Sequence, residues 1–337
     1  MNLREIDKKF GTQAKCLSYL EKMRWGKVVK CSYCLSERTH PSKSEEGRHY
    51  CYNCKRSFTV FVGTIFEDTR LDLPTWFKII TLMLNNRMGF ASKQLASQIG
   101  CSLKTAWLTS MKVRCAMIDR DTKLHGVLQM DESYFSASSS KKLKKYADNA
   151  PVLSTVTQKR GRGTNKTAVV GIVETGGSVR TKIIDKLTTR NLLGMLKNYV
   201  RTDESVLVTD GFRSYAQMDE AIEHVVVKHS ERKKGHVNTN TIEGYWSIIK
   251  NGIKGNYRSL SKKYLPFYLV QYEYQYNRRN RKVGLFDEFI KNALHDESVM
   301  LNYKPIKPPK IIVYGKEPRI KKVVKVIRKR GRPKKVA

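Results

Sequence analysis

The pattern of hydrophobic and polar positions divides the chain into a first part that reads mainly as helices and a second part that mixes strands with helices. Between residues 124 and 300, short apolar runs bounded by polar or turn-forming residues predict strands. The predicted strands are 127–130, 167–174, 179–185, 205–209 and 224–227. Helical spacing over 189–200 and 241–252 predicts helices between and after them. This alternation indicates an α/β domain.

The pattern before residue 121 is different. Apolar residues that include Leu17, Leu20 and Trp25 predict one amphipathic helix over residues 1–26. Short strand-like pieces follow, and residues 72–120 have helical spacing throughout.

The stretch 92–117 has the layout of a helix-turn-helix. Gly100 breaks the helical pattern, and Ser92 and Ser102 stand where N-caps are favoured. The second helix of such a unit can enter a major groove of DNA. Three of its side chains would then point outward: Lys104, Thr105 and Ser110. An ordinary pair of packed helices satisfies the same pattern, and only the charge of the chain favours DNA.

The charge balance indicates the kind of partner. Lys and Arg total 65 against 30 Asp and Glu, which gives a net charge of +35. Such a balance favours a polyanion, with nucleic acid as the first candidate and an anionic membrane surface as the second. No apolar run approaches the roughly 20 residues that span a bilayer, and the opening MNLREIDKKF lacks the apolar core of a secretion signal. We therefore expect a soluble cytoplasmic protein, associated with the nucleoid and without a membrane partner.

Four of the seven cysteines form two CxxC pairs, Cys31 with Cys34 and Cys51 with Cys54. Sixteen residues separate the pairs, and four thiolates at this spacing can close tetrahedrally on one Zn²⁺. A segment this short has too little core to fold without the metal. The sequence therefore predicts a structural zinc ribbon. The other three cysteines lie in helical contexts and are interpreted as small buried apolar residues.

Three acids that are far apart in the chain have contexts that suggest a shared site. Asp131 and Asp210 each close a predicted strand, and Glu243 lies at the start of a predicted helix for which Asn240 is the expected N-cap. Lys250 follows Glu243 by seven residues, which is nearly two helical turns, so both side chains should emerge on one face.

Carboxylates at strand ends and on a nearby helix can bind two divalent cations about 4 Å apart. Oxygen ligands favour Mg²⁺ or Mn²⁺ over softer metals. Each acid also has an ordinary explanation. Asp131 could belong to a solvated strand end, Asp210 to a turn, and Glu243 to a capping box. The combination of all three with Lys250 favours a catalytic metal site.

Two other segments are rich in cations. Residues 140–167, between the first and second predicted strands, include Arg160 and Arg162, and we expect a mobile loop that contacts phosphates. Near the end of the chain, Arg330 and Arg332 flank a glycine in an AT-hook-like core. Such a segment can lie in the narrow minor groove of A·T-rich DNA. The alternative for a charge run is an unstructured solubilising tail.

The stretches MDESYF, VTDGFRSY and NTNTIEGYWSIIKNGIKGNYRSLSKKYLPFYLVQYEYQYNRR, behind the four cysteines, carry a resemblance. Over about residues 15 to 295, the chain resembles the DDE transposases of bacterial insertion sequences (ISXO-like), in the zinc-ribbon group related to the Merlin elements. The resemblance implies an RNase H-like catalytic core, a mixed five-stranded sheet with helices. Asp131 would lie on its first strand, Asp210 after its fourth and Glu243 on the following helix. Some relatives use Asn as the third ligand, which leaves Asn240 and Asn238 as alternatives to Glu243.

From this resemblance we expect a transposase that binds the terminal inverted repeats of an insertion sequence. It would use two Mg²⁺ (or Mn²⁺) ions per active site to cut a strand and join its 3′-hydroxyl to target DNA, with Lys250 near the DNA end. Two DNA ends must be held together, so a homodimer or larger synaptic assembly is expected. An RNase H-like nuclease or resolvase that only cuts, and a domesticated DNA-binding regulator, remain alternatives.

The expected domain organisation has four parts. These are 1–70, the lead-in helix and zinc ribbon; 71–120, the helix-turn-helix-like segment; 121–300, the RNase H-like catalytic domain; and 301–337, the basic tail with the AT-hook-like motif.

Overall fold

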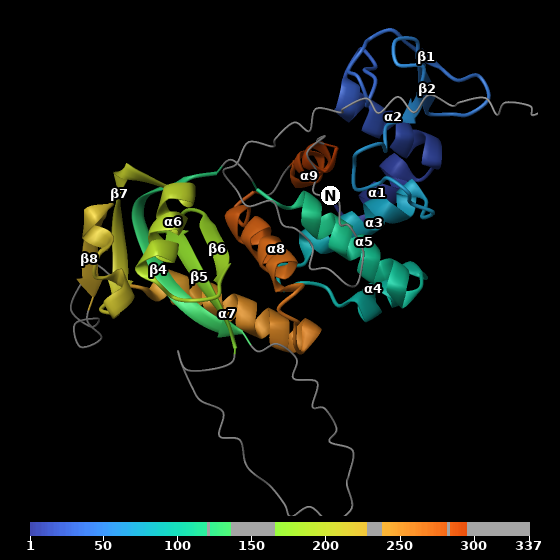
Figure 1. Cartoon of the computed structure of the whole chain (residues 1–337). Coiled ribbons are helices and arrows are strands. Elements are labelled where there is room, and N and C mark those ends of the chain that lie inside the picture. Colours follow the sequence, from blue (N-terminus) through green and yellow to red (C-terminus); the bar gives the residue numbers. More distant parts are fainter. Residues whose placement is uncertain (120–121, 136–165, 228–237, 282–283, 295–337) are drawn as a thin grey trace, which may run out of the picture.

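The computed structural model describes residues 1–119, 122–135, 166–227, 238–281 and 284–294. A sheet with flanking helices lies beside a helical body, and a small β-structured ribbon sits at the far end of that body (Figure 1). Within these ranges no helix is both long and apolar enough to cross a membrane. The loop around Arg160 and Arg162 and the tail around Arg330 and Arg332 lie outside the described residues.

The second half of the chain forms a five-stranded sheet in the order β6-β5-β4-β7-β8. Its first three strands pair antiparallel, whereas β7 runs parallel to β4 and β8 parallel to β7. The strands are β4 Leu124–Phe135, β5 Thr167–Glu174, β6 Val179–Ile184, β7 Val200–Asp210 and β8 Glu223–Val227. Helix α6, Thr189–Tyr199, is the crossover between β6 and β7. This arrangement confirms the predicted RNase H-like sheet.

The prediction that Asp131 closes its strand is wrong. Strand β4 continues to Phe135, and Asp131 pairs with Gly171 inside the antiparallel ladder to β5. The apolar run does end at Met130, but ladder hydrogen bonds come from the backbone and do not require apolar side chains. The buried side chains of Ser133 and Phe135 also keep this part of the strand in the sheet.

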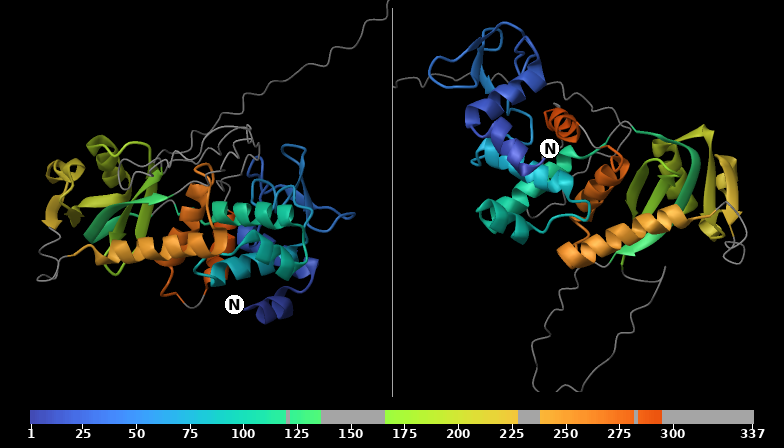
Figure 2. Two further views of the ribbon diagram at one scale, coloured as in Figure 1. Left: turned by 90° about the horizontal axis from the view of Figure 1, so that it is seen from below. Right: turned by 180° about the vertical axis from the view of Figure 1, so that it is seen from behind.

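Helices cover the two faces of the sheet differently. Helices α7, Asn240–Gly252, and α8, Leu265–Asn277, pack on one face, and α6 packs on the other. Because side chains alternate along a strand, the same strands contribute to two separate cores. Figure 2 shows α7 lying along the sheet and running on toward the helical body.

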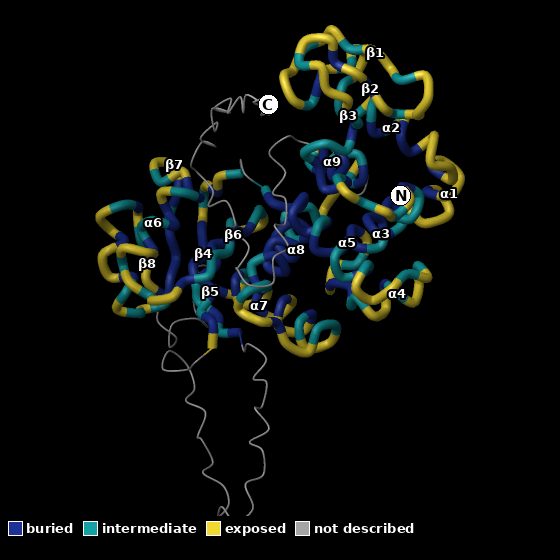
Figure 3. The backbone as a smooth tube through the Cα atoms, turned by 45° about the vertical axis from the view of Figure 1, so that its right-hand side comes forward, coloured by how far each residue is buried: buried dark blue, intermediate teal, exposed yellow. Residues whose placement is uncertain are grey.

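The helical body brings together elements from both ends of the described chain. Its members are α1 Leu3–Phe10, α2 Gln13–Trp25, α3 Leu73–Asn85, α4 Ser92–Ile99, α5 Leu103–Ala116, α8 and α9 Leu285–Ala293. One continuous core links these helices to the α7 face of the sheet. Helix α8 is buried almost throughout (Figure 3), and its buried tyrosines Tyr268, Tyr272 and Tyr274 belong to the core.

The predicted single helix over residues 1–26 is two helices. Gly11 ends α1, and Thr12 caps α2 by accepting a hydrogen bond from the Lys15 backbone N–H at 3.4 Å. A glycine followed by a good N-cap residue favours such a break over a continuous helix. Each helix then buries its own apolar residues, including Phe10 and Leu20.

The capping residues of α4 and α5 were predicted in part. Gly100 adopts the left-handed C-cap conformation at φ 77°, and Ser102 caps α5 by accepting from the Thr105 backbone N–H at 3.1 Å. The prediction for Ser92 is wrong by one position. Ala91 is the N-cap of α4, without a side-chain hydrogen bond, and Ser92 is the first helical residue.

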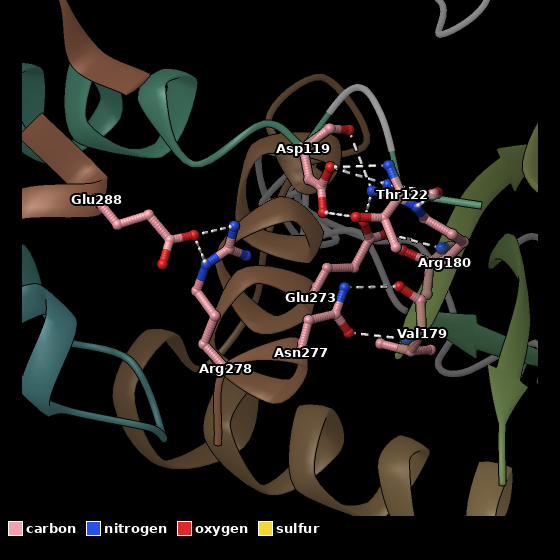
Figure 4. Close-up of polar contacts among 9 residues, drawn as sticks. Asp119, Thr122, Val179, Arg180, Glu273, Asn277, Arg278 and Glu288 are labelled. Atoms are coloured by element: carbon pink, nitrogen blue, oxygen red, sulfur yellow. Dashed lines mark hydrogen bonds and ion pairs between the residues drawn. The ribbon is translucent and has the colours of Figure 1, made fainter. Parts of the chain in front are cut away.

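A buried ion network joins the sheet to the helical body (Figure 4). Arg180 of β6 is 1% exposed and contacts the carboxylate of Asp119, just after α5, at 3.1 Å and that of Glu273 on α8 at 3.9 Å. Burial raises the pKa of Glu273 to about 7, even though Arg180 opposes the shift. Burial also acts on Asp119, but Arg180 and hydrogen bonds from Thr122 outweigh it and hold the pKa of that carboxyl below its ordinary value.

The Tyr-Asn-Arg-Arg ending of the family-like stretch has a structural role here. Asn277 accepts from the backbone N–H of Val179 at 2.7 Å and donates to its carbonyl at 3.2 Å, so it pairs with the start of β6 (Figure 4). Arg279 donates to the carbonyls of Gly177 at 2.8 Å and Gly176 at 3.1 Å in the turn between β5 and β6. These bonds hold that hairpin against α8.

Candidate active site and zinc centre

Asp131 and Asp210 lie on adjacent parallel strands at matching positions. The register pairs Gln129 of β4 with Val208 of β7, so two residues further along both strands Asp131 comes beside Asp210. Residues at matching positions of parallel neighbours point to the same face of a sheet. Both carboxylates therefore project from the face of the sheet that α7 covers. They are separated by 79 residues in sequence (210 minus 131) but by only one strand spacing in the sheet.

Gln129 fixes the start of α7 above this face. Its side chain is buried and points to the same face as that of Asp131, two residues later. Its Oε1 accepts from the backbone N–H of Ile242 at 3.1 Å, and its Nε2 donates to Thr241 Oγ1 at 3.2 Å. The first N–H groups of a helix have no partner within the helix, so Gln129 caps α7 from the sheet. The next residue, Glu243, is thereby held at the same end of the sheet as the two aspartates.

Gly171 lets α7 lie close against β5. A Cβ atom at this position would be 2.8 Å from Trp246 Cζ2 and 3.0 Å from Ile242 Cδ1. Gly171 is also the ladder partner of Asp131. The residue that allows the close approach of α7 is therefore the cross-strand neighbour of the first acid.

The electrostatics of Asp131 show that the acids influence one another. Burial, the larger cause, and the negative charges of Glu132, Asp210 and Glu243 raise the pKa of Asp131 to about 6. The acids are nevertheless a looser group than the cysteines. In the part of the chain that the structure describes, only the four cysteines bring at least three potential ligand atoms within 4.8 Å of one another.

Glu132, although adjacent to Asp131, belongs to the other face of the sheet. Its Oε2 accepts from the hydroxyl of Tyr215 at 2.9 Å, and Tyr215 lies in the core beneath α6. Of the two neighbouring acids in MDESYF, only Asp131 is directed toward α7. Alternation of side chains along the strand decides between them.

The start of α7 differs from the prediction. The N-cap is Thr239, and Asn240 is the first helical residue, so the prediction that Asn240 caps the helix is wrong. The Thr239 hydroxyl donates to Glu243 Oε1 at 3.2 Å, and the Asn240 backbone N–H donates to Asn238 Oδ1 at 3.1 Å. Glu243 and Lys250 are both exposed on α7. The two asparagines lie within the turn before Glu243.

The four cysteines of the two CxxC pairs form a compact cluster in the ribbon, whose strands are β1 Thr39–Pro41, β2 Arg48–Cys51 and β3 Ser57–Thr59. The Sγ atoms of Cys31 and Cys54 and those of Cys34 and Cys51 are each 3.6 Å apart. Ligands at about 2.3 Å around a tetrahedral Zn²⁺ would be roughly 3.8 Å apart. The donor set therefore fits zinc.

The residues predicted for the second helix of the helix-turn-helix divide into exposed and buried positions. Lys104 is exposed and Thr105 partly buried in the first turn of α5. Ser110 is buried, so the prediction that it points outward is wrong. Its hydroxyl accepts from the fully buried guanidinium of Arg114 at 3.0 Å, because this part of α5 packs against α8. The exposed residues of α5, Leu103 and Lys104, lie in its first turn.

Sequence reasoning missed Gln129 and Gly171. The signal for Gln129 was a polar residue inside the apolar run VLQM, directly before the acids. A glycine within the apolar run of β5 was the signal for Gly171, because glycine in a strand often marks a close approach of another element.

Comparison with known proteins agrees with this architecture. Residues 123–277 match an ISXO2-like transposase domain, and residues 11–57 match a transposase zinc-ribbon domain. An uncharacterized protein in transposable element ISH50 of Halobacterium salinarum is 28% identical over 275 residues, which cover 79% of this chain and 91% of the relative.

Two solved structures resemble this chain with low TM-scores. A pre-cleavage Mos1 transpososome is 13% identical, with 88% of this chain and 96% of that chain covered and a TM-score of 0.26. The mariner Mos1 paired end complex with Mg is 15% identical, with 64% and 77% covered and a TM-score of 0.25. The assignment therefore rests on strand order and the two domain matches. The chain therefore combines a transposase zinc ribbon with an ISXO2-like transposase domain that has an RNase H-like sheet.

Proposed function

We propose that this transposase binds the terminal inverted repeats of its element as double-stranded DNA, cuts a strand there and joins the 3′-hydroxyl to target DNA. The observation that carries the proposal is that three acids far apart in sequence lie at one end of the sheet, close enough to influence one another's charge. Asp131 and Asp210 share a face through the register of β4 and β7, and Gln129 holds the start of α7, with Glu243, over it. Lys250 on α7 would contact the DNA backbone beside them.

Asp131, Asp210 and Glu243 would hold two divalent cations, Mg²⁺ or Mn²⁺. The site suits a cation because neighbouring negative charges already oppose ionisation of Asp131, and a bound cation would favour its charged form. When bound, such ions activate an attacking hydroxyl and stabilise the leaving oxygen of a phosphodiester. The chain itself would keep the carboxylates in place through Gln129 and the strand register.

Structural zinc would be held by Cys31, Cys34, Cys51 and Cys54. Zinc binding in a unit this small supplies much of its folding free energy. The ribbon would then present a fixed surface to DNA or to another protein.

DNA recognition would involve the first turn of α5, where Lys104 is exposed and Thr105 partly exposed. N-terminal residues of a recognition helix are the ones that reach base edges in helix-turn-helix proteins. Contacts by Arg160 and Arg162 to phosphates, and by Arg330 and Arg332 in a minor groove, stay predictions. So does the homodimer or larger assembly that would hold two ends together.

The test uses a short duplex that carries the element's terminal repeat, a target plasmid and Mg²⁺. We expect wild-type protein to release a 3′-hydroxyl at the element end and to join it to the plasmid. Asp131→Asn should bind the duplex with unchanged affinity and yield neither product. Cutting without joined product would support a nuclease, and binding without cutting by the wild type would support a regulator.

A further inference from the structure

The C-terminal end of α7 has an unusual backbone. The helix continues into a π-helical turn, η4 Ile253–Tyr257, which is followed by Arg258 at φ 59°. Residues other than glycine rarely adopt a positive φ, and short π-helical turns are frequent at functional sites. The turn begins three residues after Lys250. Such a conformation persists only where surrounding contacts hold it.

These contacts come from the loop 86–91, which leads into α4. Asn256 Nδ2 in the turn donates to the carbonyl of Met88 at 2.9 Å. The hydroxyl of Tyr257 accepts from the backbone N–H of Phe90 at 2.9 Å and from the guanidinium of Arg114 on α5 at 3.3 Å. One phenol oxygen therefore connects the end of α7 to helix α5 and to the loop that leads into α4.

Two glycines allow the loop and the helix to approach this closely. Gly89 lies at φ 89°, and a Cβ atom there would be 2.3 Å from the Tyr257 hydroxyl. A Cβ atom at Gly252, the last residue of α7, would be 2.2 Å from the hydroxyl of Tyr272 and 2.7 Å from the carbonyl of Met88. Tyr272 itself donates to that carbonyl at 3.0 Å. The contact between the end of α7 with η4 and the loop 86–91, called the joint below, is thus closely packed as well as hydrogen-bonded.

We propose that Tyr257 is a positioning residue that sets which phosphate is cut relative to the DNA sequence bound by α4 and α5. Fourteen residues separate Glu243 from Tyr257 (257 minus 243), which is about 20 Å of nearly continuous helix. A helix of this length is stiff, so a change in orientation at the Tyr257 joint moves Glu243 with respect to the recognition helices. The inference rests on the proposed function.

The test is Tyr257→Phe, which removes the hydroxyl but keeps the ring. The ring packs on Tyr268 with centroids 4.7 Å apart and lies 5.7 Å from the Arg114 guanidinium. We expect unchanged affinity for the element end, a single-turnover cleavage rate lower by about tenfold, and cuts spread over phosphates next to the normal position. Tyr272→Phe, which loses the bond to Met88, should shift the cuts in the same way.

Tyr19→Phe is the matched control, because it removes the hydroxyl that donates to Asp287 within the helical body. It should leave rate and cutting position unchanged. Loss of stability alone would lower the active fraction without spreading the cuts. If Tyr257→Phe cuts at the normal phosphate with the wild-type rate, the proposal is wrong.

Hydrogen exchange tests the joint without any cutting. The Phe90 amide and the loop 86–91 should exchange faster in Tyr257→Phe than in the wild type, while the sheet should not change. Unchanged exchange in this loop would overturn the proposal. Failure of the wild type to cut would instead overturn the proposed function, and the two results are therefore distinguishable.

Discussion

Replacing Gly171 by alanine tests how this chain assembles its acids. The added Cβ would lie 2.8 Å from Trp246 Cζ2 and 3.0 Å from Ile242 Cδ1, whereas ordinary contacts begin near 3.4 Å. Trp246 and Ile242 are buried core residues of α7, so neither side chain can simply turn into solvent. The helix must therefore withdraw from β5 by about half an ångström or more.

Two effects follow from that withdrawal. Overpacking a core costs about 1–3 kcal/mol of unfolding free energy. The same movement carries Glu243 away from Asp131 and Asp210, and a misplacement of about 1 Å in an active site can lower a rate by roughly 100-fold. For Gly171→Ala we expect a cleavage rate lower by about tenfold to a hundredfold, which exceeds what the loss of folded protein would explain.

The assay combines single-turnover cleavage of the element end in Mg²⁺ with denaturant unfolding of the same preparations. Gly194→Ala is the matched control, since the described residues place no atom within 4 Å of a Cβ on this glycine of α6. It should raise stability by about 1 kcal/mol, as Gly to Ala does within a helix, and leave the rate unchanged. Wild-type rate and stability in Gly171→Ala would refute the close approach of α7 as the determinant of the site.

Three further predictions concern the buried carboxyl, the ribbon and the first turn of α5. The pKa of Glu273 is about 7 in the folded protein against an ordinary 4.5, so the folded state binds the proton more tightly. The wild type should lose unfolding free energy relative to Glu273→Gln as pH rises from about 5 to 8, by about 3 kcal/mol at most. The same pH dependence of the unfolding free energy in both proteins would contradict this. Chelation of zinc, or Cys51→Ser, should unfold the ribbon and weaken binding of the element end, while a circular dichroism signal from the sheet domain persists. A ribbon that stays folded in the presence of the chelator would exclude a structural metal. Lys104→Ala should weaken binding of the repeat about tenfold, measured by fluorescence anisotropy. Lys93→Ala, on exposed α4, should have a smaller effect. Equal losses of affinity in the two variants would exclude α5 as the helix that recognises the DNA sequence.

Local patterns in the sequence were sufficient for much of the fold. The CxxC spacing placed the four cysteines together, since each pair is joined by a short turn and needs no distant contact to form. The apolar runs and the helical spacing located the strands of the sheet and the crossover helix, because a two-residue or 3.6-residue period is a property of the segment itself. The boundaries were less accurate. Strand β4 runs five residues past the apolar run that predicted it, to residue 135.

The direction in which each acidic side chain points could not be predicted from the local sequence. Nothing within MDESYF states whether Asp131 or Glu132 faces α7, because the answer depends on which face of the sheet that helix covers. The structure decides it through Gln129, which reaches over a sequence separation of 113 residues to Ile242. The burial of Ser110 has the same origin, since helix α8, which packs against α5, comes more than 150 residues later.

The sequence by itself determined the chemical inventory of this protein: the acids and their order, the cysteine spacing, the excess of cations and the segments able to form strands and helices. Only the tertiary structure decided which of these groups meet. The reason is that convergence of Asp131, Asp210 and Glu243 depends on strand register, on a glycine that admits α7 and on a buried glutamine that caps it. These are relations between distant segments, and a pattern read along one segment does not contain them.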